Sequence, residues 1–452
     1  MLEWVKKING WKILAHAIVF SLLVVLLGKV LVNQHPSNIL LFIYGVGVTG
    51  TVLVSFFYAF VVYEDPHLKA KRLPNTRHSK TLVSILVSVF NEEDVITRCI
   101  ESLVSQTYPN FEVIIVNDAS TDRTLKVLRP WAMSGRIKLI DLKNNIGKKK
   151  ALAEAMLIAR GEVFAFSDSD SVLAPDAIEK IMTIFNMDPE VGAVSGHCRA
   201  LNADASLLTR IQDSWYEGQF SVRKAFESCF GSVTCVSGPL AVFRKEAIFN
   251  FIPAWQFDSF LGEEFKFATD RTLTGFVLGC EFVGQDLKQK YADSKFVKEK
   301  DYPIKHWKIL YCKSARVWTV VPDSLRRVLK QQIRWKKSFI RNIFFTGKFF
   351  WKKPLVPALV YYAHILFVFA GPFIVFRHLI FLPTTGNFTT GVLYLLGIVF
   401  VGFCFGLAYK LENPESHKWI YRPLMSLFST LVLCWLIFYS MVTIRKKIWS
   451  RA

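Results

Sequence analysis

The sequence predicts an α/β domain inserted between transmembrane helices, and composition gives the first reason. The chain has 452 residues, 52% of them hydrophobic, with 39 Phe and 12 Trp. It also carries 56 Lys and Arg against 36 Asp and Glu, a net charge of +20. An ordinary soluble protein is less apolar, and a nucleic-acid-binding protein of this charge is usually more polar. Both features fit an integral membrane protein whose basic residues gather on the cytoplasmic side of the bilayer.

The second reason is a change of pattern along the chain. Long uncharged runs stand towards both ends, whereas the middle has short apolar bursts separated by polar turns and helical patterns. The composition also excludes a disordered chain, because the apolar surface is ample for an ordered core. A disulfide scaffold is excluded as well, since eight Cys without a CxxC pair or a His cluster at ligand spacing are typical of reduced thiols.

Residues 1–64 predict two transmembrane helices. Residues 13–32 form an apolar run interrupted only by His16 and Lys29, and residues 37–63 carry no formal charge. Each run is long enough to cross about 30 Å of hydrocarbon. A cleavable signal peptide is the alternative for the first run, but a second span follows at once and no small-residue cleavage site is evident.

Basic residues flank this pair of runs on both sides. Lysines precede the first run, and residues 65–80 form a basic linker after the second. Because basic residues stay on the cytoplasmic side, we expect both ends of the pair in the cytoplasm and a short outer loop at residues 33–36. The domain that follows is therefore predicted to be cytoplasmic.

Residues 81–325 have the pattern of a Rossmann-like, doubly wound α/β domain. The apolar bursts read as buried parallel strands at residues 82–90, 113–116 and 163–166. Helical patterns alternate with them at residues 93–106 and 149–160, which predicts a doubly wound sheet.

The C-terminal part returns to membrane patterns. Residues 326–353 are basic with interleaved aromatics, which predicts helices along the membrane surface. Residues 354–452 form a C-terminal membrane region with two candidate spans at 354–376 and 388–409. Residues 423–444 are long enough for a third, but a third crossing would leave a basic tail outside. We therefore expect that last stretch to be interfacial or re-entrant.

Polar residues that end the predicted strands are the first candidates for chemistry, because ligands of such sheets bind beyond the carboxyl ends of the strands. The first strand ends in Asn91 and Glu92, and the second ends in Asn117 and Asp118. An acidic side chain at the second tip can accept hydrogen bonds from a ribose or a base edge. The alternative is that Asp118 only caps the following helix.

The third strand ends in Asp168 and Asp170. Two carboxylates separated by one residue project to the same side of an extended chain, and a hard divalent cation that also binds a diphosphate would bridge them. Between the second and third strands, Gly147 and Lys148 open a helix whose N-terminus favours an anion. A solvated basic helix start is the alternative for this segment.

Two further segments complete the set of candidates. Asp270 is an isolated carboxylate that can take a proton from a sugar hydroxyl, unless it forms an ion pair with Arg271 or another cation. The signature Gln-x-x-Arg-Trp stands in the basic helix, where Arg can clamp a diphosphate and Trp can stack on a sugar. The alternative is a membrane-interface anchor. The signature residues are Gln331, Arg334 and Trp335.

These six segments, in their order along the chain, resemble the processive family-2 glycosyltransferases of the QxxRW type, which are membrane-embedded polysaccharide synthases. The resemblance runs along nearly the whole chain and is greatest to bacterial hyaluronan synthases, then to rhizobial chito-oligosaccharide synthases. Further stretches are similar to those enzymes: residues 195–197, 202, 207–210, 236–240, 260–262, 320–323 and 439–445.

The resemblance implies a cytosolic GT-A domain that is inserted between transmembrane helices. It also implies inverting, processive β-hexosyl transfer from UDP-GlcNAc, alone or alternating with UDP-GlcA, with export of the polysaccharide through the enzyme's own channel. It implies Mg²⁺ or Mn²⁺ as cofactor. The partners implied are the UDP-sugar donor, the growing polysaccharide and the lipid bilayer of the cell membrane, and no nucleic acid.

The resemblance also implies a role for each matching residue. Glu92 and Asp118 would hold the uridine, with Lys148 near the nucleotide. Asp168 and Asp170 would form the DxD motif, with Asp170 on the metal, and Asp270 would be the general base. Three residues, Gln331, Arg334 and Trp335, would cover the diphosphate and border the acceptor. Four would lie by the acceptor at the channel mouth: Ser237, Gly238, Pro239 and Leu240.

The chain departs from the family pattern at several places. Ala119 and Ala268 stand where the family has Gly in Asp-Asp-Gly-Ser and Gly-Asp/Glu-Asp-Arg, and residues 88–90 replace Pro-Ser-Tyr. The Trp-Gly-Thr-Arg tail of hyaluronan synthases is reduced to Trp-Ser-Arg at 449–451, and residues 281–306 are extra.

Three alternatives follow from this pattern. One is a chitin, chito-oligosaccharide or other GlcNAc homopolymer synthase, and another is a non-processive lipid-linked sugar transferase, which usually lacks Gln-x-x-Arg-Trp. The third is a membrane receptor or scaffold whose α/β domain only binds a nucleotide sugar.

Overall fold

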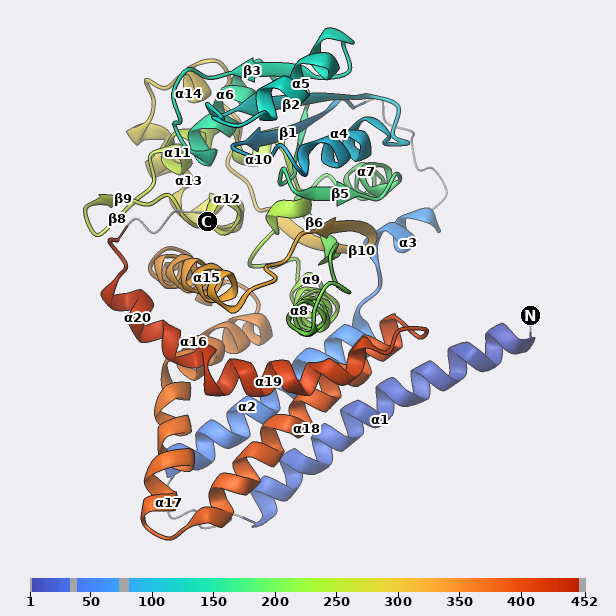
Figure 1. Cartoon of the computed structure of the whole chain (residues 1–452), viewed down its shortest axis with the longest axis vertical. Coiled ribbons are helices and arrows are strands. Elements are labelled where there is room, and N and C mark those ends of the chain that lie inside the picture. The colour runs from blue at the N-terminus through green and yellow to red at the C-terminus, as the bar shows by residue number, and fades with distance from the viewer. Residues whose placement is uncertain (1, 33–38, 73–80, 447–452) are drawn as a thin grey trace.

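The computed structural model describes residues 2–32, 39–72 and 81–446. The expected outer loop at 33–36, part of the linker and the tail at 449–451 lie outside the described residues. In Figure 1 the α/β domain lies at the top, long helices lie at the bottom, and shorter helices run between them. All eight cysteines lie in the described part and none forms a disulfide.

Four helices of the described part are long and apolar enough to cross a membrane, with mean hydropathy between 2.1 and 2.4. The first candidate span lies within α1 (Leu2–Val32). The other three start with α2 (Ile39–Phe57, continued by the π-helix Tyr58–Val62), α16 (Leu355–Phe376) and α18 (Phe388–Glu412). Large apolar side chains on them are exposed, such as Phe373 at 65% and Leu393 at 62%. These helices confirm the predicted class, an α/β domain inserted in an integral membrane protein.

The stretch after α18 is broken rather than continuous. Helix α19 (Arg422–Leu431) packs against α18 and α8, while α20 (Leu436–Val442) packs against α15. A short 3₁₀ turn (Leu433–Trp435) separates them, and the chain bends by 42° there. Length and composition allow either a broken span or a re-entrant loop, so whether this pair crosses the membrane stays a prediction.

The α/β domain is built on one eight-stranded sheet in the order β3-β2-β1-β4-β7-β6-β10-β5. The first four are parallel, because β1 pairs in parallel with β2 and β4, and β2 pairs in parallel with β3. They are β1 (Val83–Val89), β2 (Phe111–Asn117), β3 (Lys138–Asp141) and β4 (Val163–Phe166). The three strands expected from apolar bursts are therefore β1, β2 and β4.

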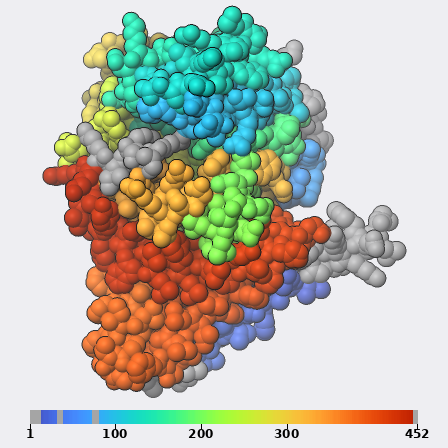
Figure 2. Space-filling view, viewed as in Figure 1, coloured from blue at the N-terminus to red at the C-terminus, as the bar shows by residue number. Residues whose placement is uncertain are grey.

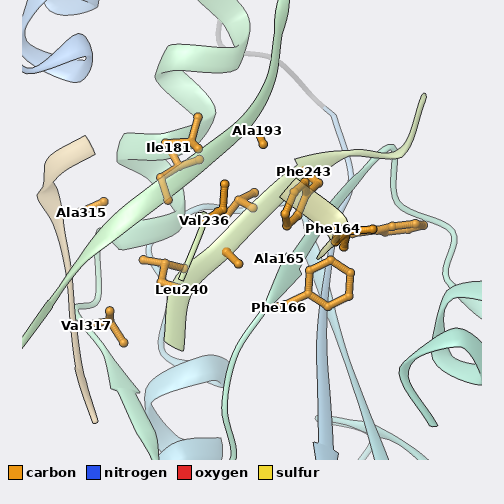
Figure 3. Close-up of a cluster of buried hydrophobic side chains, with 14 of the residues drawn as sticks. Phe164, Ala165, Phe166, Ile181, Ala193, Val236, Leu240, Phe243, Ala315 and Val317 are labelled. Atoms are coloured by element: carbon orange, nitrogen blue, oxygen red, sulfur yellow. The ribbon is translucent and has the colours of Figure 1, made fainter. Parts of the chain in front are cut away.

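The other half of the sheet was not anticipated and is mixed. Strand β7 runs antiparallel to both β4 and β6, and β5 runs antiparallel to β10. These strands are β5 (Ser171–Leu173), β6 (Val191–Ala200), β7 (Ala241–Arg244) and β10 (Lys308–Thr319). Figure 3 shows the core here, with Val236 and Leu240 pointing among Ala165, Phe243 and Val317.

The helices that connect consecutive strands cover the faces of the sheet. They are α4 (Ile96–Val104), α5 (Thr124–Met133), α6 (Lys148–Ile158) and α7 (Ala177–Met187). Half of the expected linker is also folded, since α3 (Pro66–Lys71) packs against α7 and β10. Asp65 fixes this helix: it accepts hydrogen bonds from the His67 N–H at 3.0 Å and from the Ser314 N–H at 2.7 Å.

A middle layer joins the sheet to the membrane helices, and Figure 2 shows side chains filling it on the face in view. It contains α8 (Leu207–Gly218), the π-helix η2 (Gln219–Lys224), α9 (Ala225–Ser228), α12 (Thr269–Leu278) and α15 (Leu325–Phe345). The extra residues 281–306 include most of α13 (Cys280–Lys290) and all of α14 (Lys295–Lys298). Asn250 anchors them, since its amide donates to the Phe296 and Lys300 carbonyls at 2.8 and 2.7 Å.

Short elements complete the fold. They are η3 (Gly238–Leu240), α10 (Lys245–Ile248), η4 (Phe249–Phe251), α11 (Ile252–Gln256), β8 (Ser259–Phe260), β9 (Glu263–Glu264), η5 (Thr346–Lys348), η6 (Phe350–Lys352), η7 (Arg377–Phe381), α17 (Leu382–Thr384) and η8 (Lys418–Tyr421).

Candidate active site

The carboxyl ends of β1 and β2 bring the first candidates to one edge of the sheet. Asn91 adopts a left-handed conformation, φ +55°, and its side-chain oxygen accepts the Thr121 N–H at 2.8 Å. The Glu92 N–H donates to the Thr124 hydroxyl at 2.8 Å. These cross-links hold the segment after β1 against the segment after β2, so Glu92 lies on the same edge as Asp118.

Asp118 fastens β2 to the loop that opens α6. Its carboxylate accepts the Ile146 N–H at 2.7 Å and the Gly147 N–H at 2.9 Å. Burial raises the pKa of Asp118 although both hydrogen bonds favour the ionised form. The capping alternative is wrong, because Asp122 and not Asp118 accepts the Thr124 N–H at the start of α5, at 2.9 Å.

Lys148, the first residue of α6, forms an ion pair with Asp168. Gly147 before it has φ +87°, a backbone conformation that favours glycine. Burial lowers the pKa of the Lys148 ammonium, but Asp168, Asp270 and Asp170 outweigh this and raise it. The helix start is therefore a cation held among three carboxylates, and the alternative of a merely solvated helix start is wrong.

Asp168 and Asp170 lie in a turn between β4 and β5, closed by the Ser171 N–H on the Asp168 carbonyl at 3.1 Å. The expectation of an extended chain is therefore wrong, because this hydrogen bond reverses the backbone direction. The Thr319 hydroxyl donates to Asp170 at 3.2 Å. Burial and the Asp168 charge raise the pKa of Asp170 to about 6.

This carboxylate pair fits a divalent cation. The mutual repulsion that raises the Asp170 pKa is what a bridging cation would relieve. Within the described ranges no cluster of three His, Cys, Asp or Glu side chains gathers to hold a metal. A cation here would therefore need further oxygen ligands from a bound diphosphate or water.

Asp270 occupies the first turn of α12 and faces the segment 237–240. Its carboxylate accepts the Arg271 N–H at 2.9 Å and the Gly238 N–H at 3.3 Å. The expected alternative, an ion pair with Arg271 or another cation, is not formed among the described residues, and the Arg271 guanidinium carbon lies 6.0 Å from the Phe339 ring centre instead.

The segment 237–240 bridges Asp270 and the DxD pair. A Cβ on Gly238 would lie 3.0 Å from an Asp168 carboxylate oxygen, so the backbone touches Asp168 there. Val236 and Leu240 on either side are fully buried, which anchors both ends of the segment. The proposed base and the proposed metal ligand thus share one short piece of chain between them.

Helix α15 carries the QxxRW residues to the other side of the site. Arg334 is close enough to Asp168 and Asp170 for their charges to oppose the lowering of its pKa by burial. The Trp335 ring stacks on Trp215 of α8, with ring centres 5.5 Å apart and planes 27° apart. Gln331 precedes Arg334 by one helical turn on α15.

Two residues of the middle layer were missed from the sequence. Trp215 covers one face of Trp335, and Lys224, at the end of η2, lies beneath Ser237 and donates to its hydroxyl at 2.6 Å. Neither belongs to a motif or a periodic pattern that signals a site, because each acts through contacts with distant parts of the chain.

Comparison with known proteins identifies the domain. Residues 84–249 match the family described as Glycosyl transferase family 2. The chain carries a family-2 glycosyltransferase domain. The match includes the strand ends with Glu92, Asp118, Asp168 and Asp170 and the segment 237–240, and it ends before Asp270 and α15.

Relatives extend the likeness of this glycosyltransferase beyond the matched domain. A hyaluronan synthase of Streptococcus pyogenes serotype M3 is 26% identical over 416 residues, which cover 90% of each chain. An N-acetylglucosaminyltransferase of Bradyrhizobium diazoefficiens is 31% identical over 306 residues, 66% of this chain and 58% of that one. The resemblance to both groups is therefore confirmed.

A solved structure shares the fold of this glycosyltransferase. The mannosyltransferase of Pyrobaculum calidifontis, in complex with GDP-Man and Mn²⁺, aligns with a TM-score of 0.50 at 18% identity and covers 90% of this chain and 99% of its own. The α/β part is thus a GT-A glycosyltransferase domain, and the chain joins it to apolar helices fit to span a membrane.

Proposed function

We propose that this protein is an inverting, processive β-glycosyltransferase. It polymerises N-acetylglucosamine from UDP-GlcNAc, alone or alternating with glucuronate from UDP-GlcA, and exports the polymer between its own membrane helices. The observation that supports the proposal is the convergence of three groups from distant parts of the chain. Asp270 and Asp168 meet across Gly238, and Arg334 approaches from α15.

The donor binds along the edge formed by β1, β2 and β4. Glu92 and Asp118 flank the uridine, while Lys148 and Arg334 supply positive charge for the diphosphate. Asp168 and Asp170 would hold Mg²⁺ or Mn²⁺, and the ion would supply further positive charge for the leaving diphosphate. The mannosyltransferase of the same fold was solved with GDP-Man and Mn²⁺, which supports a nucleotide sugar and a divalent cation here.

Transfer begins when Asp270 takes the proton from the acceptor hydroxyl. The acceptor oxygen then bonds to the anomeric carbon as the bond to the UDP oxygen breaks, and attack from the opposite face converts the α-linked donor into a β-linked product. Arg334 stabilises the charge that develops on UDP. Trp335, packed on Trp215, presents an aromatic surface to the acceptor sugar.

The position of the site beside the membrane helices supports export of the polymer between them. The chain matches the hyaluronan synthase over 90% of both lengths, which supports processive synthesis in a membrane protein of the cell. The GT-A domain faces the cytoplasm, where nucleotide sugars and the basic flanking segments belong. In this orientation the polymer leaves past α15 and α16 towards the outside.

A cluster of cations favours an acidic polymer. Arg223, Arg271 and Lys336 all lie near His364 of α16, and the Arg223 guanidinium is 3.1 Å from its Nε2. Arg223 also pairs with Glu227 at 3.5 Å, which neutralises part of the positive charge of this cluster. Arg271 follows the base directly, so these charges lie where a chain would leave Asp270. A carboxylate on every second sugar would find favourable partners there, whereas a neutral polymer would not.

The rhizobial N-acetylglucosaminyltransferases support a second candidate, a chitin or chito-oligosaccharide synthase. The two are separated by supplying the lipid-embedded protein with UDP-GlcNAc and Mn²⁺, with and without UDP-GlcA. A hyaluronidase-sensitive product that needs both donors supports the first, and a chitinase-sensitive product from one donor supports the second. A product that resists both enzymes and partitions into organic solvent supports a lipid-linked transferase. Absence of UDP release from any UDP-sugar would refute an enzyme and leave a binding protein.

A further inference from the structure

Lys224 is a buried lysine whose ammonium lies directly beneath the proposed acceptor segment 237–240. It ends the π-helix η2, which follows α8 without a break. A π-helix fits an extra residue into each turn and so redirects the side chains that follow, and such turns are frequent at functional sites. Here the result is that the Lys224 side chain enters the protein, with the residue only 7% exposed.

All three protons of this ammonium are used. They are donated to the Ser195 hydroxyl at 2.8 Å, the Cys235 carbonyl at 2.7 Å and the Ser237 hydroxyl at 2.6 Å. The same ammonium lies 4.4 Å from the Phe220 ring centre. Each hydrogen-bond acceptor is neutral. Burial lowers the pKa of this ammonium, whereas the nearby Glu227 and Asp270 carboxylates and the Phe220 ring face favour its charged form.

The hydroxyl groups of Ser195 and Ser237 differ in whether their own proton has a hydrogen-bond acceptor. The Ser195 hydroxyl accepts from Lys224 and from the Ser237 N–H at 3.4 Å, and it donates to the Gly196 carbonyl at 3.2 Å. The Ser237 hydroxyl accepts from Lys224 and, in the part of the chain that the structure describes, donates to nothing. Ser237 is also partly exposed, next to Gly238, which donates to Asp270.

A hydroxyl whose oxygen accepts from an ammonium is a stronger donor, because the charge polarises its O–H bond. With Lys224 below it, the remaining proton of Ser237 has to point away from Lys224, towards the exposed side of the segment. That side adjoins Asp270 and the face where an acceptor sugar would come. A sugar oxygen is the kind of group that such a donor binds.

We propose that Lys224 is a positioning residue for the acceptor: it fixes the segment 237–240 and orients the Ser237 hydroxyl to donate to the acceptor sugar. This inference rests on the proposed function, since it concerns the sugar that Asp270 deprotonates. The family resemblance already implies that the segment 237–240 lies by the acceptor, and the new element is that Lys224 acts on the acceptor through the Ser237 hydroxyl. The donor side of the site, built on Asp118 and Asp168, touches the backbone of this segment at Gly238 and not the Ser237 hydroxyl, so Ser237→Ala leaves that contact in place.

The test uses the full-length protein in lipid nanodiscs with chitotetraose as acceptor. Ser237→Ala and Lys224→Met should each lower kcat/KM for the acceptor about tenfold, the effect of one hydrogen bond to a substrate. The affinity for UDP with Mn²⁺, measured by calorimetry, should stay within twofold of wild type. Ser237→Thr, which keeps the hydroxyl, should restore most of the acceptor kcat/KM.

The double variant tests whether the two residues act together. If Lys224 works through Ser237, the variant with both changes should be no worse than Lys224→Met alone. Effects that multiply instead would overturn the inference, as would a Ser237→Ala protein with wild-type acceptor kinetics. The Ser237→Ala result stands even where Lys224→Met fails to fold.

Two controls complete the design. Lys245→Met removes another lysine that lies over phenyl rings, those of Phe164 and Phe249, and should leave acceptor kinetics unchanged. Asp270→Asn distinguishes a wrong base from a wrong role for Lys224. If Asp270→Asn stays active, Asp270 is not the base. If it is inactive while Ser237→Ala has normal acceptor kinetics, Asp270 remains the base and Lys224 does not position the acceptor.

Discussion

Arg199 joins the catalytic domain to the membrane helix α18, and replacing it with methionine measures the strength of this junction. Its guanidinium binds Asp213 through two hydrogen bonds, at 2.9 and 2.6 Å, and Glu217 at 2.9 Å. It also reaches Asn413 at 2.7 Å and Tyr409 at 2.8 Å, at the end of α18. The side chains of Asp213 and Glu217 are 1% and 2% exposed. This is a buried cation that satisfies two buried carboxylates.

The structure sets the magnitude of the effect. Burial raises the pKa of Glu217, but His197 and Arg199 outweigh it and hold the pKa well below its usual range. Arg199→Met leaves both carboxylates buried without this cation, and breaking such a pair costs about 3–5 kcal/mol. We expect this loss in the free energy of unfolding. Activity should fall too, because α8, which carries both carboxylates, also carries Trp215.

The assay is denaturant titration of the purified protein in detergent micelles. Arg210→Met is the matched control, because Arg210 pairs with Asp204 at 3.9 Å with side chains 40% and 74% exposed. That variant should change the free energy of unfolding by less than about 1 kcal/mol. If Arg199→Met were as mild as this control, the network would not hold the domain to α18 and the reasoning would fail.

Three further predictions follow from the site. Ala119 has φ +58°, where the family pattern has Gly. Ala119→Gly should relieve about 1–2 kcal/mol of backbone strain, and the greater entropy of the unfolded chain should cost about 0.4–1 kcal/mol of that gain. The melting temperature should therefore rise slightly, and a lower one would contradict this prediction. Arg223→Ala and Lys336→Ala should shorten the polymer made from both donors, seen on sizing gels, while products from UDP-GlcNAc alone stay the same length. Because the raised pKa of Asp170 is about 6, its proton competes with a cation below that pH; the Mn²⁺ concentration for half-maximal activity should rise as pH falls from 7 to 5, and a constant value would exclude Asp170 as a ligand.

The sequence predicted the parts of the site that local patterns carry. Strand ends at Glu92, Asp118 and Asp168 follow from apolar bursts and polar turns, since residues close in sequence decide both. The same holds for the start of α6 at Lys148. The sequence pattern could not predict the antiparallel strands β5 and β7, because pairing between distant segments depends on tertiary packing rather than on the pattern within each strand.

Other features of the site could not be predicted either, because they also depend on contacts that form only in the folded chain. The turn at Asp168 and Asp170 depends on one backbone hydrogen bond, which alternation of residue types does not reveal. Lys224 and Trp215 lie in an ordinary helical pattern, and only the folded chain brings them to Ser237 and Trp335. Their contributions come from contacts that join residues far apart in sequence.

The central claim is that Asp270 is the general base of sugar transfer, and Asp270→Asn tests it most directly. The amide keeps the shape of the side chain but cannot take the acceptor proton. The measurement is steady-state UDP release with saturating UDP-sugars and Mn²⁺, beside UDP affinity by calorimetry. The account predicts a fall in kcat of about 10²–10⁴-fold with UDP affinity within twofold of wild type. Turnover at the wild-type rate would contradict it.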